Sequence, residues 1–287
     1  RVVPTGPITA QLKKLNGEFG SSALCLPLDA TREQDAIAAA REAGSRFGSI
    51  DVLVNNAGYG QLGLFEEVSG EDVERQFHTN VFGMMHVTRA VLPVMRKQRG
   101  GHILNLASVG GFMGFDGASI YCAAKFAVEG FSESLALEVA PFGIKVTIVG
   151  PGFFRTDFLD KKSVQYGSRK IADYAEFSSS SRSAYESYNH KQPGDPAKLG
   201  QVFLNLLKNA CEAMGPVVDR PRQLVIRTAA QAGEDVVVSV QDSGVGIDGD
   251  HADHPRLGLA LARGVTAALL DGHVDRQPGL AVEGGDV

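Results

Sequence analysis

The run His102-Ile103-Leu104-Asn105-Leu106 is short and apolar, with two glycines directly before it and Ser108 just beyond its end. Such a run, bounded by turn residues, predicts a buried strand. A helical pattern follows it over residues 119–140. The same alternation recurs elsewhere, with strands predicted at 23–29, 50–54 and 145–149 and helices at 31–47 and 70–98. Strands that alternate with long helices predict an α/β fold with a doubly wound parallel sheet, whose ligands bind beyond the carboxyl ends of the strands.

The composition is that of an ordinary folded protein. The chain has 287 residues, of which 44% are hydrophobic and 21% charged, and its formal net charge is -5. This acidic balance, without a long Lys/Arg cluster, argues against a nucleic-acid or membrane-surface partner and favours a small-molecule substrate. Cys25, Cys122 and Cys211 form neither a disulfide framework nor a zinc pattern, which favours a reducing, cytoplasmic compartment. No apolar run approaches the ~18 residues of a membrane-spanning helix.

The character of the sequence changes after residue 160. Residues 160–195 are polar and contain a serine-rich run at 178–183, which predicts a mobile lid or linker. Beyond this segment we predict a helix at 201–214, a hairpin of strands at 223–229 and 235–241, and a final helix at 256–270. The chain therefore divides into residues 1–195 and a smaller α+β fragment, residues 196–287.

Tyr121 and Lys125 stand four residues apart in the predicted helix 119–140, so the phenol and the ammonium lie on one helix face. A free tyrosine has a pKa near ~10 and is a poor base at neutral pH, but a neighbouring cation favours the phenolate and lowers that pKa. Ser108 could hydrogen-bond a substrate oxygen and hold it against the tyrosine. The three side chains predict proton transfer to or from an alcohol or a carbonyl group.

Further motifs accompany these three residues in one order and at one set of spacings. They are Asn55-Asn56-Ala57-Gly58 after a strand, Asn80 within residues 79–83, and Pro151-Gly152 through to Thr156. The whole set resembles the short-chain dehydrogenase/reductase family over about residues 1–195. The resemblance implies a Rossmann-like fold, NAD(P) as cofactor, an alcohol or carbonyl substrate and a possible homo-oligomer.

The resemblance also implies a role for each motif residue. Tyr121 would be the general acid/base, and Lys125 would lower the pKa of Tyr121 and hold the nicotinamide ribose. Ser108 would orient the substrate, and Asn80 would anchor a proton-relay water. The other cofactor-binding residues would be Asp29 beside the adenine, Asn56, Ala57 and Gly58 along the cofactor floor, and Pro151, Gly152 and Thr156 near the nicotinamide amide.

Residue type alone leaves plainer interpretations open for three of these positions. Asn80 could be a hydrogen-bonding residue inside a helix, and Asn55-Asn56 could be only a turn former. Asp29 could equally cap the helix that follows it.

Members of this family open with a strand, a Thr-Gly-x-x-x-Gly-x-Gly turn and a helix, whose backbone N–H groups hold the cofactor pyrophosphate. This sequence shows no such turn, because Thr5-Gly6-Pro7 lacks the later glycines and Pro7 lacks an N–H donor. Residues 1–3 align better with the family's second strand and residues 8–18 with its second helix. We therefore expect an N-terminally truncated sheet and impaired NAD(P) binding. The sequence does not indicate whether NADH or NADPH is preferred.

Residues from about 196 to 284 resemble a second family, the ATP-binding domain of sensor histidine kinases. In the segment similar to its N box, Asn209 would coordinate Mg²⁺ and Asn205 would lie beside it. In the segment similar to its G1 box, Asp242 would accept the adenine amino proton, Gly244 and Gly246 would permit close approach of the nucleotide, and Gly258 would open the G2 helix. Only residues 248–256 separate these two boxes, too few for an ATP lid, so bound ATP and Mg²⁺ are possible but not expected.

The leading hypothesis is an NAD(P)-dependent oxidoreductase in which a hydride passes between the nicotinamide and an alcohol or carbonyl substrate while Tyr121 transfers the proton. The alternatives are an ATP-binding, histidine-kinase-like module and a non-catalytic chimera of two incomplete halves. Neither half shows the residue spacing of a resident metal site.

Overall fold

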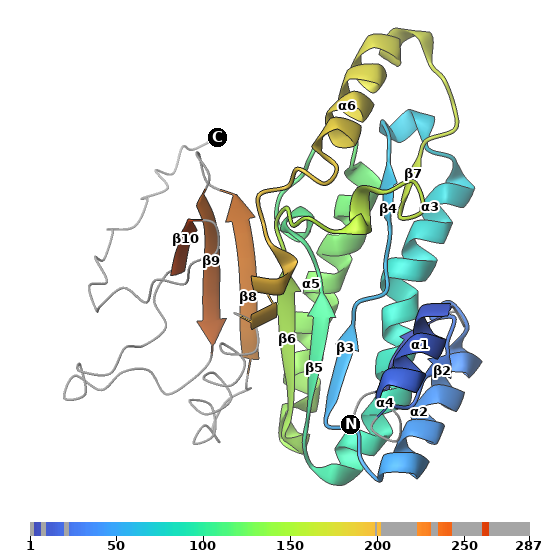
Figure 1. Ribbon diagram of the computed structural model, residues 1–287, viewed down its shortest axis with the longest axis vertical. Coiled ribbons are helices and arrows are strands. Elements are labelled where there is room, and N and C mark those ends of the chain that lie inside the picture. Colours follow the sequence, from blue (N-terminus) through green and yellow to red (C-terminus); the bar gives the residue numbers. More distant parts are fainter. Residues whose placement is uncertain are drawn as a thin grey trace, which may run out of the picture.

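The computed structural model describes residues 3–6, 10–19, 23–198, 200–201, 223–230, 235–242 and 260–263. Its main sheet has six strands in the order β10-β9-β8-β6-β5-β3 (Figure 1). The strands β3 (Val52–Asn55), β5 (Gly101–Leu106), β6 (Ile144–Gly150) and β8 (Gln223–Ala230) are parallel. The predicted α/β fold with a Rossmann-like parallel sheet is confirmed in this part of the chain.

The long helices form where the apolar periodicity predicts them. They are α2 (Glu33–Phe47), α3 (Gly70–Phe77), α4 (Met84–Gln98) and α5 (Ser119–Val139). A π-helical segment, η3 (His78–Gly83), joins α3 to α4 without a break. Short 3-10 turns lie at η2 (Phe65–Glu67), η4 (Val109–Gly111), η5 (Ala140–Phe142), η6 (Asp157–Leu159) and η7 (Ala172–Tyr174).

The main core lies between the sheet and the helices α4 and α5. Ile103 of β5 is fully buried and packs in one cluster with Met95 of α4 and Leu135 of α5. Gly101 begins β5 with a φ of +156°, and a Cβ there would lie 2.6 Å from the sulfur of Met95. A glycine is required at this point because only hydrogen fits between the strand and the helix.

The N-terminal strands do not join the main sheet. The structure has β1 (Thr5–Gly6), α1 (Ala10–Phe19) and β2 (Leu26–Pro27), and β1 pairs only with β2 in a separate two-stranded sheet. The strand predicted over 23–29 is therefore shorter than expected and lies outside the doubly wound sheet. Among the described strands, β3 pairs with β5 alone, and its Val52 and Val54 side chains are 55% and 53% exposed.

Residues 160–195, predicted as a mobile lid or linker, contain regular secondary structure. They contain β7 (Val164–Tyr166), which pairs with β4 (Gly60–Leu62), and α6 (Ala175–Tyr188). Tertiary contacts override the poor helix propensity of the serine run. Ser178 Oγ donates to Glu67 Oε2 at 2.6 Å, and Tyr185 Oη donates to the carbonyl of Asp116 at 2.8 Å.

Where a hairpin is predicted near the C-terminus, β8 and β9 (Asp235–Asp242) pair antiparallel, and β8 lies beside β6. Within the range 256–270, predicted as a helix, residues 260–263 are described as β10 (Ala260–Arg263) on the edge of β9. There a ladder of strand hydrogen bonds replaces the helical pattern. Most of the helix predicted at 201–214 lies outside the described residues.

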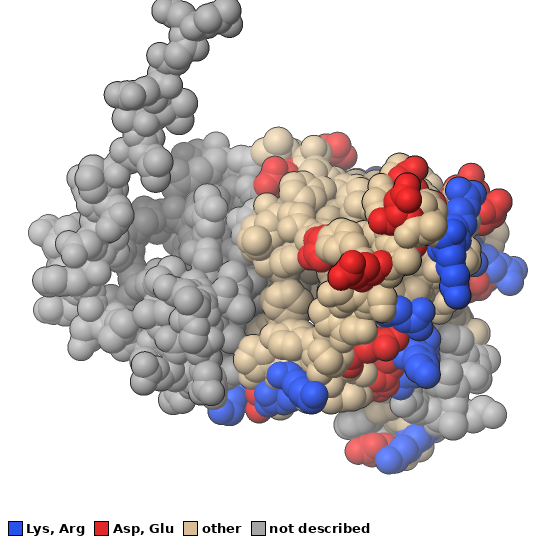
Figure 2. Space-filling model, turned by 90° about the horizontal axis from the view of Figure 1, so that it is seen from above, with Lys and Arg blue, Asp and Glu red and all other residues tan. Residues whose placement is uncertain are grey.

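Figure 2 shows acidic and basic side chains interspersed over the described part of one face. None of the helices that the structure describes is both long enough and apolar enough to cross a membrane.

A histidine buried in the sheet makes the stability of the fold sensitive to acid. His102 in β5 is 9% exposed, and its Nε2 lies 2.6 Å from Thr147 Oγ1 of β6. Burial, aided by the positive charge of Lys145, lowers the pKa of His102 to about 4 from an ordinary value of 6.5. The unfolded chain therefore binds the proton more readily than the folded one between these two pH values.

We predict that the free energy of unfolding falls by on the order of 3 kcal/mol as the pH drops from 6.5 to 4. The substitution His102→Gln keeps a hydrogen-bonding side chain without a titrating group and should flatten this dependence. Urea unfolding at a series of pH values measures the effect. The exposed His78→Gln is the control and should retain the full acid sensitivity; an unchanged slope in His102→Gln would contradict the assignment.

Candidate active site

Three loops at the carboxyl ends of β3, β5 and β6 meet around one cavity. The backbone N–H of Ala107 donates to Val149 at 2.8 Å and that of Val109 donates to Pro151 at 2.8 Å, which keeps the last two loops side by side. The cavity has a volume of about 320 Å³, within the ~300–1,000 Å³ typical of small-molecule sites. Nine of the residues expected from the sequence line it: Asn56, Gly58, Asn80, Ser108, Tyr121, Lys125, Pro151, Gly152 and Thr156.

Tyr121 and Lys125 lie in the first two turns of α5, and Ser108 lies directly after β5. The Lys125 ammonium is 5.8 Å from the centre of the Tyr121 ring and donates to the backbone carbonyl of Leu106 at 2.7 Å. Ser108 and Tyr121 line the same cavity, and Ser108 acts on Tyr121 to lower the pKa of the phenol. Ser108 Oγ also accepts from the backbone N–H of Gly110 at 3.1 Å, which fixes the serine hydroxyl at the cavity.

The protonation states differ from the expectation that Lys125 depresses the pKa of Tyr121. Burial raises the pKa of Tyr121 to about 12, and Ser108 offsets only part of this rise. Burial also lowers the pKa of Lys125 to about 8, against the opposing effect of the Glu129 carboxylate. The physical reason is that the protein interior disfavours both charged forms more than the two groups favour each other's charge.

Asn80 lies in the π-helical segment η3 and is 3% exposed. Its Oδ1 accepts from the backbone N–H of Tyr59 at 3.1 Å, and its Nδ2 donates to the carbonyl of Tyr59 at 2.9 Å. Gln76, one turn earlier, also donates to that carbonyl at 3.2 Å. Asn80 is therefore a hydrogen-bonding residue within a helical segment that fixes the loop after β3, and it lines the cavity as well.

Two expected cofactor residues do not line the cavity. Ala57 is exposed in the loop between Asn56 and Gly58. Asp29 is exposed, and its Oδ1 accepts from the backbone N–H of Thr31 at 3.0 Å and from the Thr31 hydroxyl at 2.7 Å. These hydrogen bonds lower the pKa of Asp29. The N-cap position of α2 is Arg32, so Asp29 forms a local turn and does not cap that helix.

Sequence reasoning missed most of the apolar lining of the cavity. It comes from residues far apart in the chain: Tyr59, Leu62, Phe115, Phe153, Phe154, Phe158, Leu159 and Tyr185. The Tyr121 and Phe158 ring centroids are 5.6 Å apart, and Tyr185 reaches the cavity from α6. No local pattern marks these positions, since their common feature is a shared cavity and not a shared motif.

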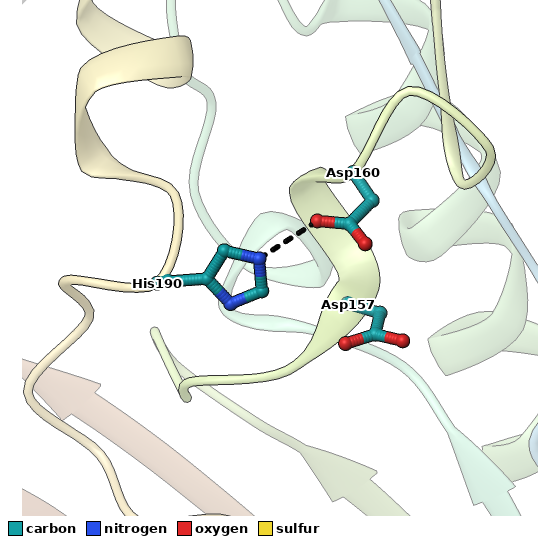
Figure 3. Close-up of side chains that lie close together, drawn as sticks. All are labelled: Asp157, Asp160 and His190. Carbon is teal, nitrogen blue, oxygen red and sulfur yellow. Dashed lines mark hydrogen bonds and ion pairs between the residues drawn. The ribbon is translucent and has the colours of Figure 1, made fainter.

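An ion-pair cluster holds the segment after α6 against the loop that follows Thr156 (Figure 3). Asp160 Oδ1 lies 2.9 Å from His190 Nε2 and accepts from Asn189 Nδ2 at 3.0 Å. The hydrogen bond from Asn189 is the main reason that the pKa of Asp160 is lowered. Lys162 Nζ lies 2.7 Å from Asp157 and 3.8 Å from Asp160, so its ammonium neutralises part of the negative charge of the two carboxylates.

The expected ATP-binding residues cannot be placed at a site. Asn205, Asn209, Gly244, Gly246 and Gly258 lie outside the described residues, and Asp242 is known only as the last residue of β9.

The fold and the cavity define an α/β oxidoreductase with a serine, a tyrosine and a lysine at the carboxyl edge of its sheet. Residues 5–167 match the family described as short chain dehydrogenase, and residues 194–285 match the family described as Histidine kinase-, DNA gyrase B-, and HSP90-like ATPase. The chain belongs to the short-chain dehydrogenase/reductase family, whose members are NAD(P)-dependent oxidoreductases. Its C-terminal segment carries the second resemblance that the sequence predicts.

Individual relatives agree with this placement. The chain is 39% identical to 3-ketodihydrosphingosine reductase of Bacteroides thetaiotaomicron, over 70% of this chain and 79% of the relative. It is 35% identical to oxidoreductase BOA17 of Botryotinia fuckeliana, over 72% and 75% of the two chains. Among solved structures, a short-chain dehydrogenase from Streptomyces avermitilis is 37% identical with a TM-score of 0.65 and 78% of each chain covered. A closed serine dehydrogenase in complex with NADP+ is 32% identical with a TM-score of 0.53, over 55% of this chain and 64% of that one.

Proposed function

We propose that this protein interconverts a small alcohol and the corresponding carbonyl compound with NAD(P), and that Tyr121 exchanges the proton. The observation that carries this proposal is the meeting of Ser108, Tyr121 and Lys125 at one cavity. The reductase and the NADP+-bound dehydrogenase among the relatives support it. A cytoplasmic location and a homo-oligomer stay predictions from the sequence.

The donor set at the cavity suits the nicotinamide half of the cofactor. A ribose needs hydrogen-bonding partners for its hydroxyls, and Tyr121 and Lys125 offer a hydroxyl and an ammonium. We assign Pro151, Gly152 and Thr156 to the nicotinamide amide and Asn56, Ala57 and Gly58 to the cofactor floor. Asp29 remains the proposed neighbour of the adenine, at a distance from the lining of the cavity.

The proposed mechanism uses the protonation states of the site. When bound, the cofactor supplies or accepts the hydride at the carbon that bears the substrate oxygen. In reduction, Ser108 donates a hydrogen bond to that oxygen, and Tyr121, which its raised pKa keeps protonated at neutral pH, gives it a proton. The Lys125 ammonium stabilises the phenolate that remains, until Tyr121 recovers a proton from solvent. In oxidation the proton moves in the opposite direction, and Asn80 keeps the loop at Tyr59 in place throughout.

We also propose that residues 1–287 alone bind the pyrophosphate half of the cofactor poorly. The glycine-rich turn of the family has no counterpart in residues 1–30, and the two short strands β1 and β2 lie apart from the main sheet. A phosphate site of this kind depends on several backbone N–H groups at a helix N-terminus. Without them, the nicotinamide half must supply most of the binding energy.

The substitution Tyr121→Phe should lower kcat by about 10²–10⁴-fold, because it removes the group that transfers the proton. In the unaltered protein, reduction should be nearly independent of pH around neutrality, whereas alcohol oxidation should become faster with rising pH because it requires the phenolate. Absorbance of NAD(P)H with a panel of ketones and alcohols measures both rates. Tyr174→Phe, which removes a hydroxyl bonded to Glu66, is the matched control. Equal activity in Tyr121→Phe and the control would refute the mechanism.

Titration of residues 1–287 with NADPH, followed by the cofactor's own fluorescence, should show weak binding with a dissociation constant above ~1 µM. A short-chain dehydrogenase that carries the glycine-rich turn serves as the positive control. Sub-micromolar binding by this chain would show that the turn is not needed here.

The match of residues 194–285 to the histidine-kinase-like ATPases favours one second function, ATP binding. Only residues 248–256 separate the segments similar to the G1 and G2 boxes, which is too few for an ATP lid. We therefore expect little or no binding of a fluorescent ATP analogue in the presence of Mg²⁺. If binding is found, Asn209→Ala should weaken it, because that side chain would coordinate the metal. Binding that requires Asn209 would establish the second function and contradict our expectation.

A further inference from the structure

Aromatic and aliphatic side chains form a continuous part of the cavity lining, which we call the apolar wall. It consists of Leu62, Phe115, Phe153, Phe154, Phe158 and Leu159. None of these residues is among those assigned above to the cofactor or to proton transfer. The apolar wall is therefore left for the part of the substrate that lies beyond its reacting carbon.

The cavity offers almost no charge to a substrate. Of the described residues that line it, Lys125 alone has a charged side chain. Its ammonium donates to the carbonyl of Leu106 at 2.7 Å and lies 5.8 Å from the centre of the Tyr121 ring, at the reacting end of the cavity. A carboxylate or a phosphate at the other end of a substrate would be buried without a partner charge, which is costly.

Several polar side chains of the lining are already used within the protein. Asn80 spends both atoms of its carboxamide on the backbone of a neighbouring loop, and the Tyr185 hydroxyl donates to a backbone carbonyl at 2.8 Å. The hydroxyl of Tyr59 and the Oε1 atom of Gln192 are buried and present almost no accessible surface. Along the apolar wall, a substrate is therefore held mainly by apolar contacts.

Phe158 in η6 is the part of the apolar wall that lies next to Tyr121. The two ring centroids are 5.6 Å apart, with a tilt of 55° between the ring planes. A Cβ added at Gly60 would lie 3.3 Å from Phe158 Cζ, so the ring also packs against β4. The Phe158 ring is thus held where a substrate bound at Tyr121 would meet it.

Contacts among aromatic rings also fix the shape of the wall. The Phe153 ring makes edge-to-face contacts with Phe115 at 5.9 Å and with Tyr188 at 5.5 Å between centroids. Such contacts favour one arrangement of the rings. A wall whose shape is set in advance binds a matching apolar body without the cost of ordering its own side chains.

We propose that the substrate is an uncharged ketone, or the corresponding alcohol, whose aromatic or aliphatic body packs on the apolar wall, and that Phe158 is a specificity-determining residue for that body. The proposal rests on the proposed function, because it places the carbonyl group at Ser108 and Tyr121. It excludes substrates that carry a carboxylate or a phosphate away from the reacting carbon.

The test compares aromatic ketones of similar shape that differ in charge. The ligands are para-isopropylacetophenone, para-acetylbenzamide and para-acetylbenzoate, which carry an apolar group, a neutral polar group and a carboxylate at the same ring position. Binding to the full chain is measured by titration with saturation-transfer NMR, without cofactor or turnover. The value of kcat/KM for each ketone is then measured with NADPH.

In the unaltered protein, the isopropyl ketone should bind at least about 100-fold more tightly than the carboxylate, because an unpaired charge is costly to bury. The amide should lie between them. This series needs no variant, so it tests the charge of the substrate independently of any effect of a substitution on folding.

Two substitutions test the role of Phe158. Phe158→Ala should weaken the binding of the isopropyl ketone about ten-fold, because it removes an aromatic contact. Phe158→Arg places a guanidinium on the apolar wall and should narrow the gap between the isopropyl ketone and the carboxylate at least about ten-fold. Phe177, which is exposed on α6 and does not line the cavity, supplies the controls Phe177→Ala and Phe177→Arg. Both controls should keep the affinities of the unaltered protein, and thermal melting shows whether each variant is folded.

Three results would overturn the proposal. They are no measurable binding of the isopropyl ketone, equal or tighter binding of the carboxylate in the unaltered protein, and unchanged affinities in folded Phe158 variants. Failure of the proposed function is a separate result. A preference for the isopropyl ketone without turnover would support the apolar class and reject only the catalytic role of Tyr121, whereas turnover of the carboxylate alone would keep that role and reject the apolar class.

Discussion

The site depends on a positive charge buried at the junction of a helix and a strand. Lys125 is 7% exposed, and its ammonium donates to the carbonyl of Leu106 at 2.7 Å, at the end of β5. Burial of an ammonium is costly unless it is hydrogen bonded, so this contact fixes where α5 lies relative to the strand. The same contact holds Tyr121, one turn earlier on α5, beside Ser108. The position of the proposed acid/base group, Tyr121, thus depends on the hydrogen bond between the Lys125 ammonium and the backbone.

Burial at this junction also sets the protonation states of the two side chains. It raises the pKa of Tyr121 to about 12 and lowers that of Lys125 to about 8, so the resting tyrosine is a proton donor. A donor suits carbonyl reduction, in which the substrate oxygen gains a proton. Burial acts on His102 in β5 in the same way. The protein interior disfavours the charged imidazolium, so the pKa of His102 is lowered and the stability of the fold depends on pH.

Several features could be predicted from the sequence, and others could not. The alternation of β3, β5 and β6 with α4 and α5 could be predicted, because apolar runs and helical periodicity are local patterns in the sequence. The helix α6 could not be predicted, because its serines favour turns and the contacts of Ser178 and Tyr185 with distant residues stabilise it.

The sequence by itself determined the family and the residues that meet at the site, because residue type and spacing along a strand or helix are local properties. Ser108, Tyr121 and Lys125 were identifiable for that reason, and so were the two families joined in one chain. Only the tertiary structure decided which residues share the cavity, and that Asp29 and Ala57 lie outside its lining. Burial, the shifts of pKa that follow from it and the supply of hydrogen-bond partners are set by residues far apart in the chain, and no local pattern records them.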